Sequence, residues 1–336
     1  MDYNSFFSSF AADIISFLLK AIILVFCFAA VVAISVSSKK KNSSEFSMSI
    51  INLKEKLLEQ ALSIKKQILS KDDLKKYKKE QEALEKTKNE NPNLYVIDFK
   101  GSIDAKEVAS LKQEVNAIIS SHKKGDEVMV NLESGGGVVH GYGLAAMQLS
   151  RIRDAGINLT VCVDKVAASG GYMMACVADN LIAAPFSIIG SIGVIGQLPN
   201  FNRLLDKCNV DYEQHTAGNF KRTLTMLGKN SDESRAKFKD DLENIHKLFK
   251  GFIAKYRPDL DIAEVSTGEC WFGTDALNMK LVDHISTSDD FLLNKLSSHN
   301  LYKIEYKANK GIMSKLEAFG FKVADRILEY FKFNIR

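Results

Sequence analysis

The sequence lacks several patterns that would point directly to a class of protein. Its five cysteines are scattered and form no CxxC pair, which argues against a zinc site and a disulfide framework, so we expect free thiols, with Cys162 and Cys176 buried. Only four prolines and no repeat of fixed period occur in 336 residues. The net charge is +4, and the lysines are spread through a linker and a tail and are not concentrated on a motif with interleaved aromatic residues. We therefore expect no nucleic-acid partner.

Charge is absent from one long stretch near the N-terminus. Residues 14–38 are apolar apart from Lys20. A helix of about 24 residues is about 36 Å long, enough to cross a bilayer. Residues 1–13 form a tail without a basic cluster, which favours a transmembrane anchor over a cleaved signal peptide. The Lys39–Lys41 cluster after the span favours a cytoplasmic location for the remainder of the chain.

Composition divides the rest of the chain into three parts. Residues 39–92 are rich in Lys and Glu and predict a charged helical stalk or linker that ends near Pro92. Expected strands and helices alternate over residues 93–290, which indicates an α/β domain with parallel strands. Residues 291–336 predict an amphipathic helical tail that packs on the protein or a partner subunit, with a membrane surface as the alternative.

Two stretches rich in small residues follow expected strands. Ser169, in DKVAASGGYMMACVADN, lies where a strand ends and a helix begins. Unpaired N–H groups at a helix N-terminus stabilise negative charge, so this hydroxyl is a candidate nucleophile, with an ordinary N-cap serine as the alternative. The SGGG stretch at 134–137 can turn N–H groups toward a cavity, as an oxyanion hole requires. It matches neither GxGxxG nor a Walker loop, which argues against nucleotide binding.

A nucleophilic serine needs a base. None of the six histidines lies in a motif-like context, although His140 follows the glycine stretch and could approach it. Lys221, in TAGNFKRTLTML, lies between a turn of small residues and an apolar stretch. Burial disfavours the charged form of a lysine, so a Ser–Lys dyad is chemically feasible. A solvated surface lysine is the alternative, and the sequence does not show whether Lys221 and Ser169 meet.

Five blocks together carry a family resemblance. They are YVIDFKGSIDAKEV, SGGGVVHGYGLAAMQL, VDKVAASGGYMMACVAD, SIIGSIGVIG and GECWFGTDALNMKLVD, in this order. With them, residues 94–285 resemble the signal peptide peptidase A and SohB family of membrane-anchored bacterial serine peptidases. The resemblance implies the fold shared by Clp protease and crotonase, a spiral of β-β-α units, here preceded by the transmembrane helix and the stalk. It also implies a serine endopeptidase that needs neither a metal nor a cofactor.

The resemblance assigns roles to individual positions. Ser169 matches the nucleophile and Lys221 the general base, while Ser191, in GSIG, matches the hydroxyl that holds the lysine amine. The block after Ser169 contains no histidine, which argues against the Ser–His–Asp triad of Clp-type peptidases.

The oxyanion hole is implied at two backbone N–H groups, those of Gly170 and Gly137. The usual family loop is Ser-Pro-Gly-Gly, and Gly135 stands where the proline would be. A glycine there makes the loop more flexible, so the choice between Gly136 and Gly137 stays open.

The resemblance further implies partners and a location. The substrates are peptides or membrane-protein fragments, with leftover signal peptides among them, and the bilayer holds the N-terminal helix. A homo-oligomeric ring is expected, in which the serine and lysine of one site come from adjacent subunits. The expected location is the bacterial inner membrane with a single span. The family favours the periplasmic face for the peptidase domain, whereas the flanking charge favours the cytoplasm. A crotonase-type acyl-CoA enzyme and a catalytically silent membrane adaptor are the alternative functions.

Overall fold

The computed structural model describes residues 16–17, 20, 46–86, 91–218 and 220–308. The expected anchor at 14–38 lies outside the described residues except at three positions, and so does the tail from residue 309 onward. Among the helices within the described ranges, none is long and apolar enough to cross a membrane. Contacts between Cα atoms separate a compact unit, Met48–Lys307, from a second unit made of the two chain ends. The candidate site lies wholly in the first unit.

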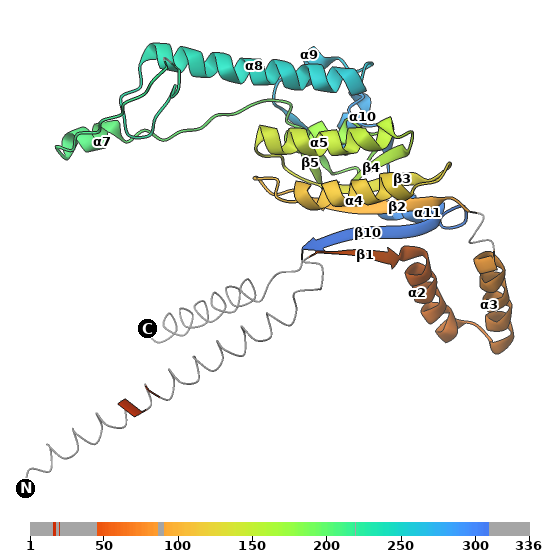
Figure 1. Ribbon diagram of the computed structural model, residues 1–336. Coiled ribbons are helices and arrows are strands. Elements are labelled where there is room, and N and C mark those ends of the chain that lie inside the picture. Colours follow the sequence, from red (N-terminus) through yellow and green to blue (C-terminus); the bar gives the residue numbers. More distant parts are fainter. Residues whose placement is uncertain (1–15, 18–19, 21–45, 87–90, 219, 309–336) are drawn as a thin grey trace, which may run out of the picture. The chain divides into compact units, whose positions relative to one another are not determined.

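The centre of this unit is a seven-stranded sheet (Figure 1). The strand pairs from β10 to β9 are parallel, which confirms the expected α/β class. Parallel strands are covered on both faces and therefore consist of nearly continuous apolar runs, as in NLTVCV of β4. In order across the sheet, the strands are β1 (Phe46–Asn52), β10 (Asn300–Ala308), β2 (Asn93–Lys100), β3 (Glu127–Glu133), β4 (Asn158–Val163), β6 (Asn180–Ala183) and β9 (His284–Ile285).

A smaller sheet of three strands carries the part of the chain where the chemistry is expected. Strand β5 (Val166–Ala168) pairs in parallel with β7 (Ile188–Gly190), and β7 pairs antiparallel with β8 (Cys270–Phe272). Ser134, directly after β3, bridges to Ala167 of β5, so the two sheets meet there. The end of β3 in the large sheet therefore lies beside β5 in the small sheet.

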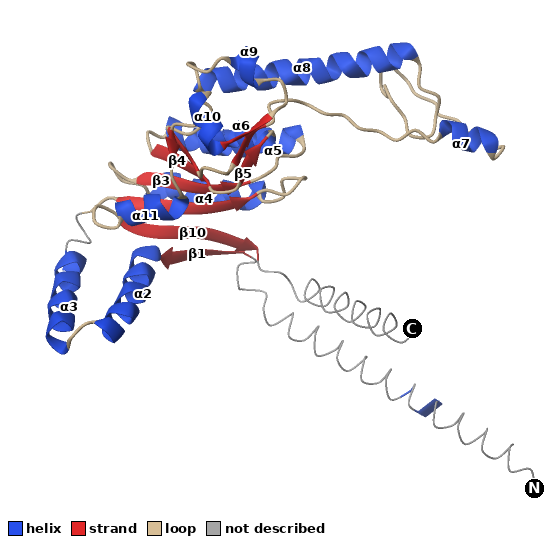
Figure 2. Ribbon diagram, turned by 180° about the vertical axis from the view of Figure 1, so that it is seen from behind, coloured by secondary structure: helices blue, strands red, loops and turns tan. Residues whose placement is uncertain are grey.

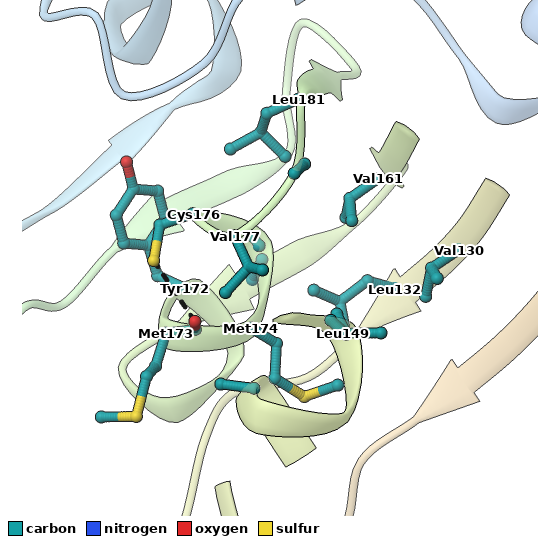
Figure 3. Close-up of a cluster of buried hydrophobic side chains, with 14 of the residues drawn as sticks. Val130, Leu132, Leu149, Val161, Tyr172, Met173, Met174, Cys176, Val177 and Leu181 are labelled. Atoms are coloured by element: carbon teal, nitrogen blue, oxygen red, sulfur yellow. Dashed lines mark hydrogen bonds between the residues drawn. The ribbon is translucent and has the colours of Figure 1, made fainter. Parts of the chain in front are cut away.

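Helices pack beside these strands. The helix α5 (Val139–Asp154) lies between α4 (Val108–Ser121) and the short α6 (Gly170–Ala175). Farther along the chain are α8 (Asp232–Tyr256), α9 (Ile262–Val265), α10 (Gly273–Asn278) and α11 (Ser288–Lys295). Around α6 the side chains form a dense apolar cluster (Figure 3), whose labelled members are Val130, Leu132, Leu149, Val161, Tyr172, Met173, Met174, Cys176, Val177 and Leu181.

The two buried cysteines are free thiols within the core, as expected. Burial raises the pKa of both Cys162 and Cys176 to about 12. Their thiols therefore stay protonated at neutral pH and act as small apolar groups.

Two strands differ from the expected organisation. The segment expected to be a helical stalk contains, among its described residues, the strand β1 and two helices, α2 (Leu53–Ile68) and α3 (Lys71–Lys86). The segment expected to be a helical tail contains β10, which buries Leu301 and Ile304. The sheet thus extends past both expected boundaries of the peptidase domain, because β10 pairs with β2 across some 200 residues of sequence, and local periodicity does not report such pairing.

The chain between β7 and α8 has a different character. Residues 194–230, here called the excursion, contain the short helix α7 (Asn202–Lys207), which lies at the far end of this segment in Figure 2. No described residue of the excursion is buried. Its two arms are joined by side-chain amides, since Asn200 donates to the backbone oxygens of Thr225 (2.8 Å) and Gly228 (3.0 Å).

Candidate active site

Ser169 lies in a strained turn between β5 and α6. Its backbone adopts φ 52° and ψ −118°, a left-handed conformation that is uncommon for a residue with a side chain. Its N–H donates to the Gly190 carbonyl (2.8 Å), and its own carbonyl accepts from the Met173 N–H (3.0 Å). Strain of this kind costs about 1–3 kcal/mol and persists only where the surroundings enforce it. The turn therefore holds the hydroxyl in a position that a relaxed loop would not keep.

The two positions after Ser169 require glycine because neighbouring groups lie too close for a side chain. A Cβ on Gly170 would lie 2.4 Å from Cγ of Tyr142, and one on Gly171 would lie 2.4 Å from the carbonyl oxygen of Ser134. No side chain fits at either position unless the structure moves. The small residues around Ser169 thus bring α5 and the end of β3 against the turn.

The glycine stretch after β3 lies against the same turn. A Cβ on Gly136 would lie 2.8 Å from Cβ of Ser169 and 2.7 Å from the nitrogen of Gly170. The Gly136 N–H donates to the Ser134 hydroxyl oxygen (3.1 Å). By contrast, among the hydrogen bonds of the described residues none uses the N–H of Gly137 or of Gly170 as donor. These two N–H groups, but not that of Gly136, are available to an incoming ligand.

Ser191 follows β7 just as Ser169 follows β5. Ala168 and Gly190 are register partners in the parallel pair, so the two serines extend from adjacent positions of the ladder. Ser191 also has φ 52°, and its N–H donates to the Glu269 carbonyl (2.6 Å). Both serines are therefore held at the ends of paired strands.

A cavity of about 650 Å³ opens beside these residues. Ser169, Ser191, Gly137 and Gly170 all line it. Apolar side chains from α5, α6, α8 and the start of the excursion form much of its wall: Val139, Met173, Val194, Ile195, Ile245 and Phe249. The cavity suits an apolar ligand whose polar group is directed at the two serines and the free N–H groups.

Lys221 is not brought to this cavity. It lies on the excursion, is exposed, and is absent from the lining residues, none of which is a lysine in the described part of the chain. The structure thus gathers four of the five residues singled out from the sequence and leaves the expected base apart from them within one subunit. Residues that could hold a metal ion are also not found together in the described ranges.

His246 reaches the cavity although the sequence patterns did not single it out. It lies on α8, and its Nε2 is 3.2 Å from the carbonyl oxygen of Ile192. A carbonyl only accepts, so Nε2 carries a proton and donates it. His246, Phe249 and Ile253 recur at helical spacing, and the last two are buried. That period was the available signal for a histidine on the inward face of α8.

Two family profiles and several relatives match this chain. The N-terminal profile of peptidase family S49 matches residues 9–149, and the profile of peptidase family S49 itself matches residues 151–301. The chain is 45% identical over 328 residues to the putative protease SohB of Buchnera aphidicola from Baizongia pistaciae, which spans 91% of this chain and 93% of that protein. It is 44% identical over 318 residues to the probable protease SohB of Haemophilus influenzae, with 89% and 90% covered.

Among solved structures, the membrane-bound stomatin-specific protease 1510-N aligns with 13% identity and a TM-score of 0.38, covering 61% of this chain and 84% of that one. The sequence matches confirm the expected family and, with it, a serine-type peptidase. On the strength of relatives that extend along nearly its whole length, the chain belongs to peptidase family S49.

Proposed function

We propose that the chain is a membrane-anchored serine endopeptidase in which Ser169 is the nucleophile. The observation that carries this proposal is the turn at Ser169, where a strained backbone presents the hydroxyl beside the free N–H groups of Gly137 and Gly170. Donors in this arrangement match the developing charge of a tetrahedral intermediate. The apolar cavity beside the turn supports peptide substrates with apolar side chains.

The proposed mechanism uses Lys221 as the base. Its neutral amine takes the proton from Ser169 Oγ while the oxygen attacks the peptide carbonyl carbon, and the N–H groups of Gly137 and Gly170 bind the resulting oxyanion. Lys221 then gives the proton to the leaving amine, and water hydrolyses the acyl-enzyme. The Ser191 hydroxyl holds the lysine amine. The reaction requires neither a metal nor a cofactor.

In this proposal Lys221 acts on the Ser169 of an adjacent subunit in a homo-oligomeric ring. The support is the composition of the excursion, which exposes large apolar side chains that its own subunit does not cover. Ile195 is 76% exposed, Leu204 56% and Phe220 51%. Exposed large apolar side chains gathered on one segment are typical of a protein interface. A second copy that covers it would carry its neighbour's lysine toward the cavity.

The proposed substrates are peptides or fragments of membrane proteins, leftover signal peptides included, and the fold is proposed to be the Clp protease and crotonase type. Residues 14–38 are proposed as the single span in the bacterial inner membrane, with the peptidase domain on the periplasmic face. Protease treatment of intact spheroplasts tests the topology. Digestion of the domain without lysis supports the periplasmic side, and digestion only after lysis contradicts it.

A fluorophosphonate probe tests the reaction itself. The full-length protein is labelled in detergent, digested, and analysed by mass spectrometry for the modified residue. We expect the label on Ser169, because an activated serine beside oxyanion donors reacts with such probes. An acyl-CoA enzyme or a silent adaptor leaves Ser169 unlabelled, and this result would contradict the proposal.

A further inference from the structure

Beside the glycine stretch, four residues are linked by a chain of hydrogen bonds whose two hydroxyl groups are buried. The Ser134 hydroxyl lies 2.5 Å from the Tyr142 hydroxyl, and the latter lies 2.9 Å from the carbonyl oxygen of Ser102. The Gly136 N–H reaches the Ser134 oxygen at 3.1 Å. Tyr142 is 0% exposed and Ser134 2%, so water does not compete for these groups.

Counting protons gives each bond its direction. The Ser102 carbonyl only accepts, so the Tyr142 hydroxyl donates its single proton to that oxygen. The Ser134 hydroxyl must then donate to the Tyr142 oxygen, which leaves the Ser134 oxygen to accept from Gly136. Burial raises the pKa of Tyr142, so the phenol keeps its proton at neutral pH. Every group in the chain is satisfied in one direction only, which makes the arrangement specific.

These hydrogen-bonded side chains lie against both expected parts of the oxyanion hole, the glycine stretch and Gly170. At one end, the Ser134 oxygen accepts the N–H of Gly136, the residue directly before Gly137. The ring of Tyr142 lies against Gly170, at a distance that leaves no room for a Cβ on that residue. The backbone of Ser134 is fixed in turn to β5, since its N–H donates to Val166 (2.9 Å) and its carbonyl accepts from Ala168 (3.0 Å).

We propose that Ser134 and Tyr142 are positioning residues that hold the glycine stretch so that the Gly137 N–H points at the reacting carbonyl. This proposal rests on the proposed function of Ser169. Gly135 stands in the loop where a proline would restrict the backbone, and a loop of three glycines has wide conformational freedom. The buried hydroxyl chain supplies the restriction instead. It occupies the Gly136 N–H and thereby selects Gly137 as the donor.

The test separates transition-state binding from substrate binding. Tyr142→Phe keeps the ring against Gly170 and removes the hydroxyl, while Ser134→Ala removes the acceptor for Gly136. Full-length variants are assayed with acetyl-trileucine aminomethylcoumarin, chosen for the apolar cavity. We expect kcat to fall about 10-fold to 100-fold with KM nearly unchanged, below the loss of about 100-fold to 1,000-fold for removal of a whole oxyanion donor.

Two matched inhibitors give an independent readout. The Ser169 Oγ adds to the aldehyde carbon of acetyl-trileucinal, its proton passes to the base, and the former carbonyl oxygen of the hemiacetal occupies the oxyanion hole. Acetyl-trileucinol has the same peptide but no carbonyl at that carbon, so it forms no such adduct. In both variants the affinity for the aldehyde should fall by about the same factor as kcat, and the affinity for the alcohol should stay the same. A structural weakening alone would not separate the two inhibitors.

Tyr172→Phe is the control. Tyr172 is also 0% exposed and also donates to a backbone carbonyl, that of Leu281 at 2.8 Å, but it makes no bond to the glycine stretch. It should lose thermal stability as Tyr142→Phe does and keep wild-type kcat.

Wild-type kcat and aldehyde affinity in Tyr142→Phe would overturn the inference even if Ser134→Ala fails to fold. Ser169→Ala distinguishes the two levels of the argument. If that variant is inactive while Tyr142→Phe is normal, the positioning role alone fails, whereas an active Ser169→Ala removes the proposed function itself.

Discussion

Ser169 and Lys221 lie in two regions that are built in opposite ways. The helix after Ser169 is buried at every position from Gly170 to Ala175, and the turn is bonded to β7 and packed against α5. The excursion around Lys221 has no buried residue among those described. One region fixes its chemical group through its own subunit, while the other exposes apolar side chains that a neighbour can cover. In the proposed mechanism, therefore, the fold of one subunit preorganises Ser169, whereas the position of Lys221 depends on the proposed assembly.

The largest effect is expected on the fixed side of this comparison. Ser169→Ala should lower the hydrolysis of a fluorogenic peptide by at least about 1,000-fold, because the loss of the nucleophile removes the acyl-enzyme route. Gel filtration should show the elution volume of the wild type, since alanine keeps the Cβ of Ser169 and removes only its hydroxyl. Appreciable turnover in this variant would remove Ser169 from the reaction.

The next effect tests the exposed side. Lys221→Arg should be as inactive as Lys221→Ala, because a guanidinium stays protonated and cannot accept the serine proton. If the base comes from a neighbour, mixing and reassembling Ser169→Ala with Lys221→Ala subunits should restore part of the activity. Each variant mixed with itself is the control. An active Arg variant, or an active wild-type monomer in gel filtration, would contradict this division between the regions.

A pair of glycine substitutions compares the tightly packed turn after Ser169 with an exposed face of α8. Gly171→Ala should destabilise the protein by about 1–3 kcal/mol or more, because the new Cβ meets the Ser134 carbonyl oxygen at 2.4 Å. Gly251→Ala, on the exposed face of α8, has nothing within 4 Å and should stabilise the helix by about 0.5–1 kcal/mol. Denaturant unfolding measures both. Equal changes in unfolding free energy for the two variants would show that the turn after Ser169 is not rigid.

The last expected effect concerns α8, which joins the excursion to the core. At its C-terminal end Arg257 binds Asp283 through two hydrogen bonds of 2.7 and 2.8 Å. Burial alone would raise the pKa of Asp283, but the hydrogen bonds from Arg257 and the Leu181 N–H outweigh it, and the net pKa is lowered. The stability from this group is therefore present above the unfolded pKa, about 3.9, and is lost as pH falls through the lower folded value.

Asp283→Asn should accordingly cost about 1–3 kcal/mol at neutral pH and flatten the acid limb of the stability curve. Asp240→Asn is the control, since Asp240 pairs with Lys237 at the exposed N-terminal half of α8 and should change stability by less than about 0.5 kcal/mol. Thermal melts from pH 7 to pH 3 measure both variants. A larger loss of stability in Asp240→Asn than in Asp283→Asn would show that the C-terminal end of α8 is not the end held to the core.

Local patterns were sufficient for the strands and turns that place Ser169, the proposed nucleophile. The apolar runs of β2, β3 and β4 are typical of strands covered on both faces, and the small residues after Ser169 indicated a tight turn. The sequence also led to the glycine stretch, but it left Gly136 and Gly137 equivalent. The distinction depends on the Ser134 hydroxyl, which occupies the Gly136 N–H, and no spacing rule reports where a buried hydroxyl points.

Other features depend on contacts between distant residues. Strand β10 has its partner in β2, far along the chain. Strand β1 lies in a segment rich in Lys and Glu, so composition favoured a stalk and a tail. His246 reaches the cavity only because α8 packs across it. Lys221 is hardest to place from sequence, since its segment has no buried residue to fix its position within one subunit.

The pairing of β5 with β7 has a consequence for how this site tolerates change over evolution. Ser169 and Ser191 each follow one member of the register pair Ala168 and Gly190. Their separation in space is therefore set by the spacing of two neighbouring strands, about 4.8 Å, and not by the length of chain between them. Insertions and deletions between α6 and β7 can accumulate without moving either hydroxyl, provided that the ladder keeps its register. A slip of one residue, in contrast, would separate the two serines while leaving the composition of the chain untouched.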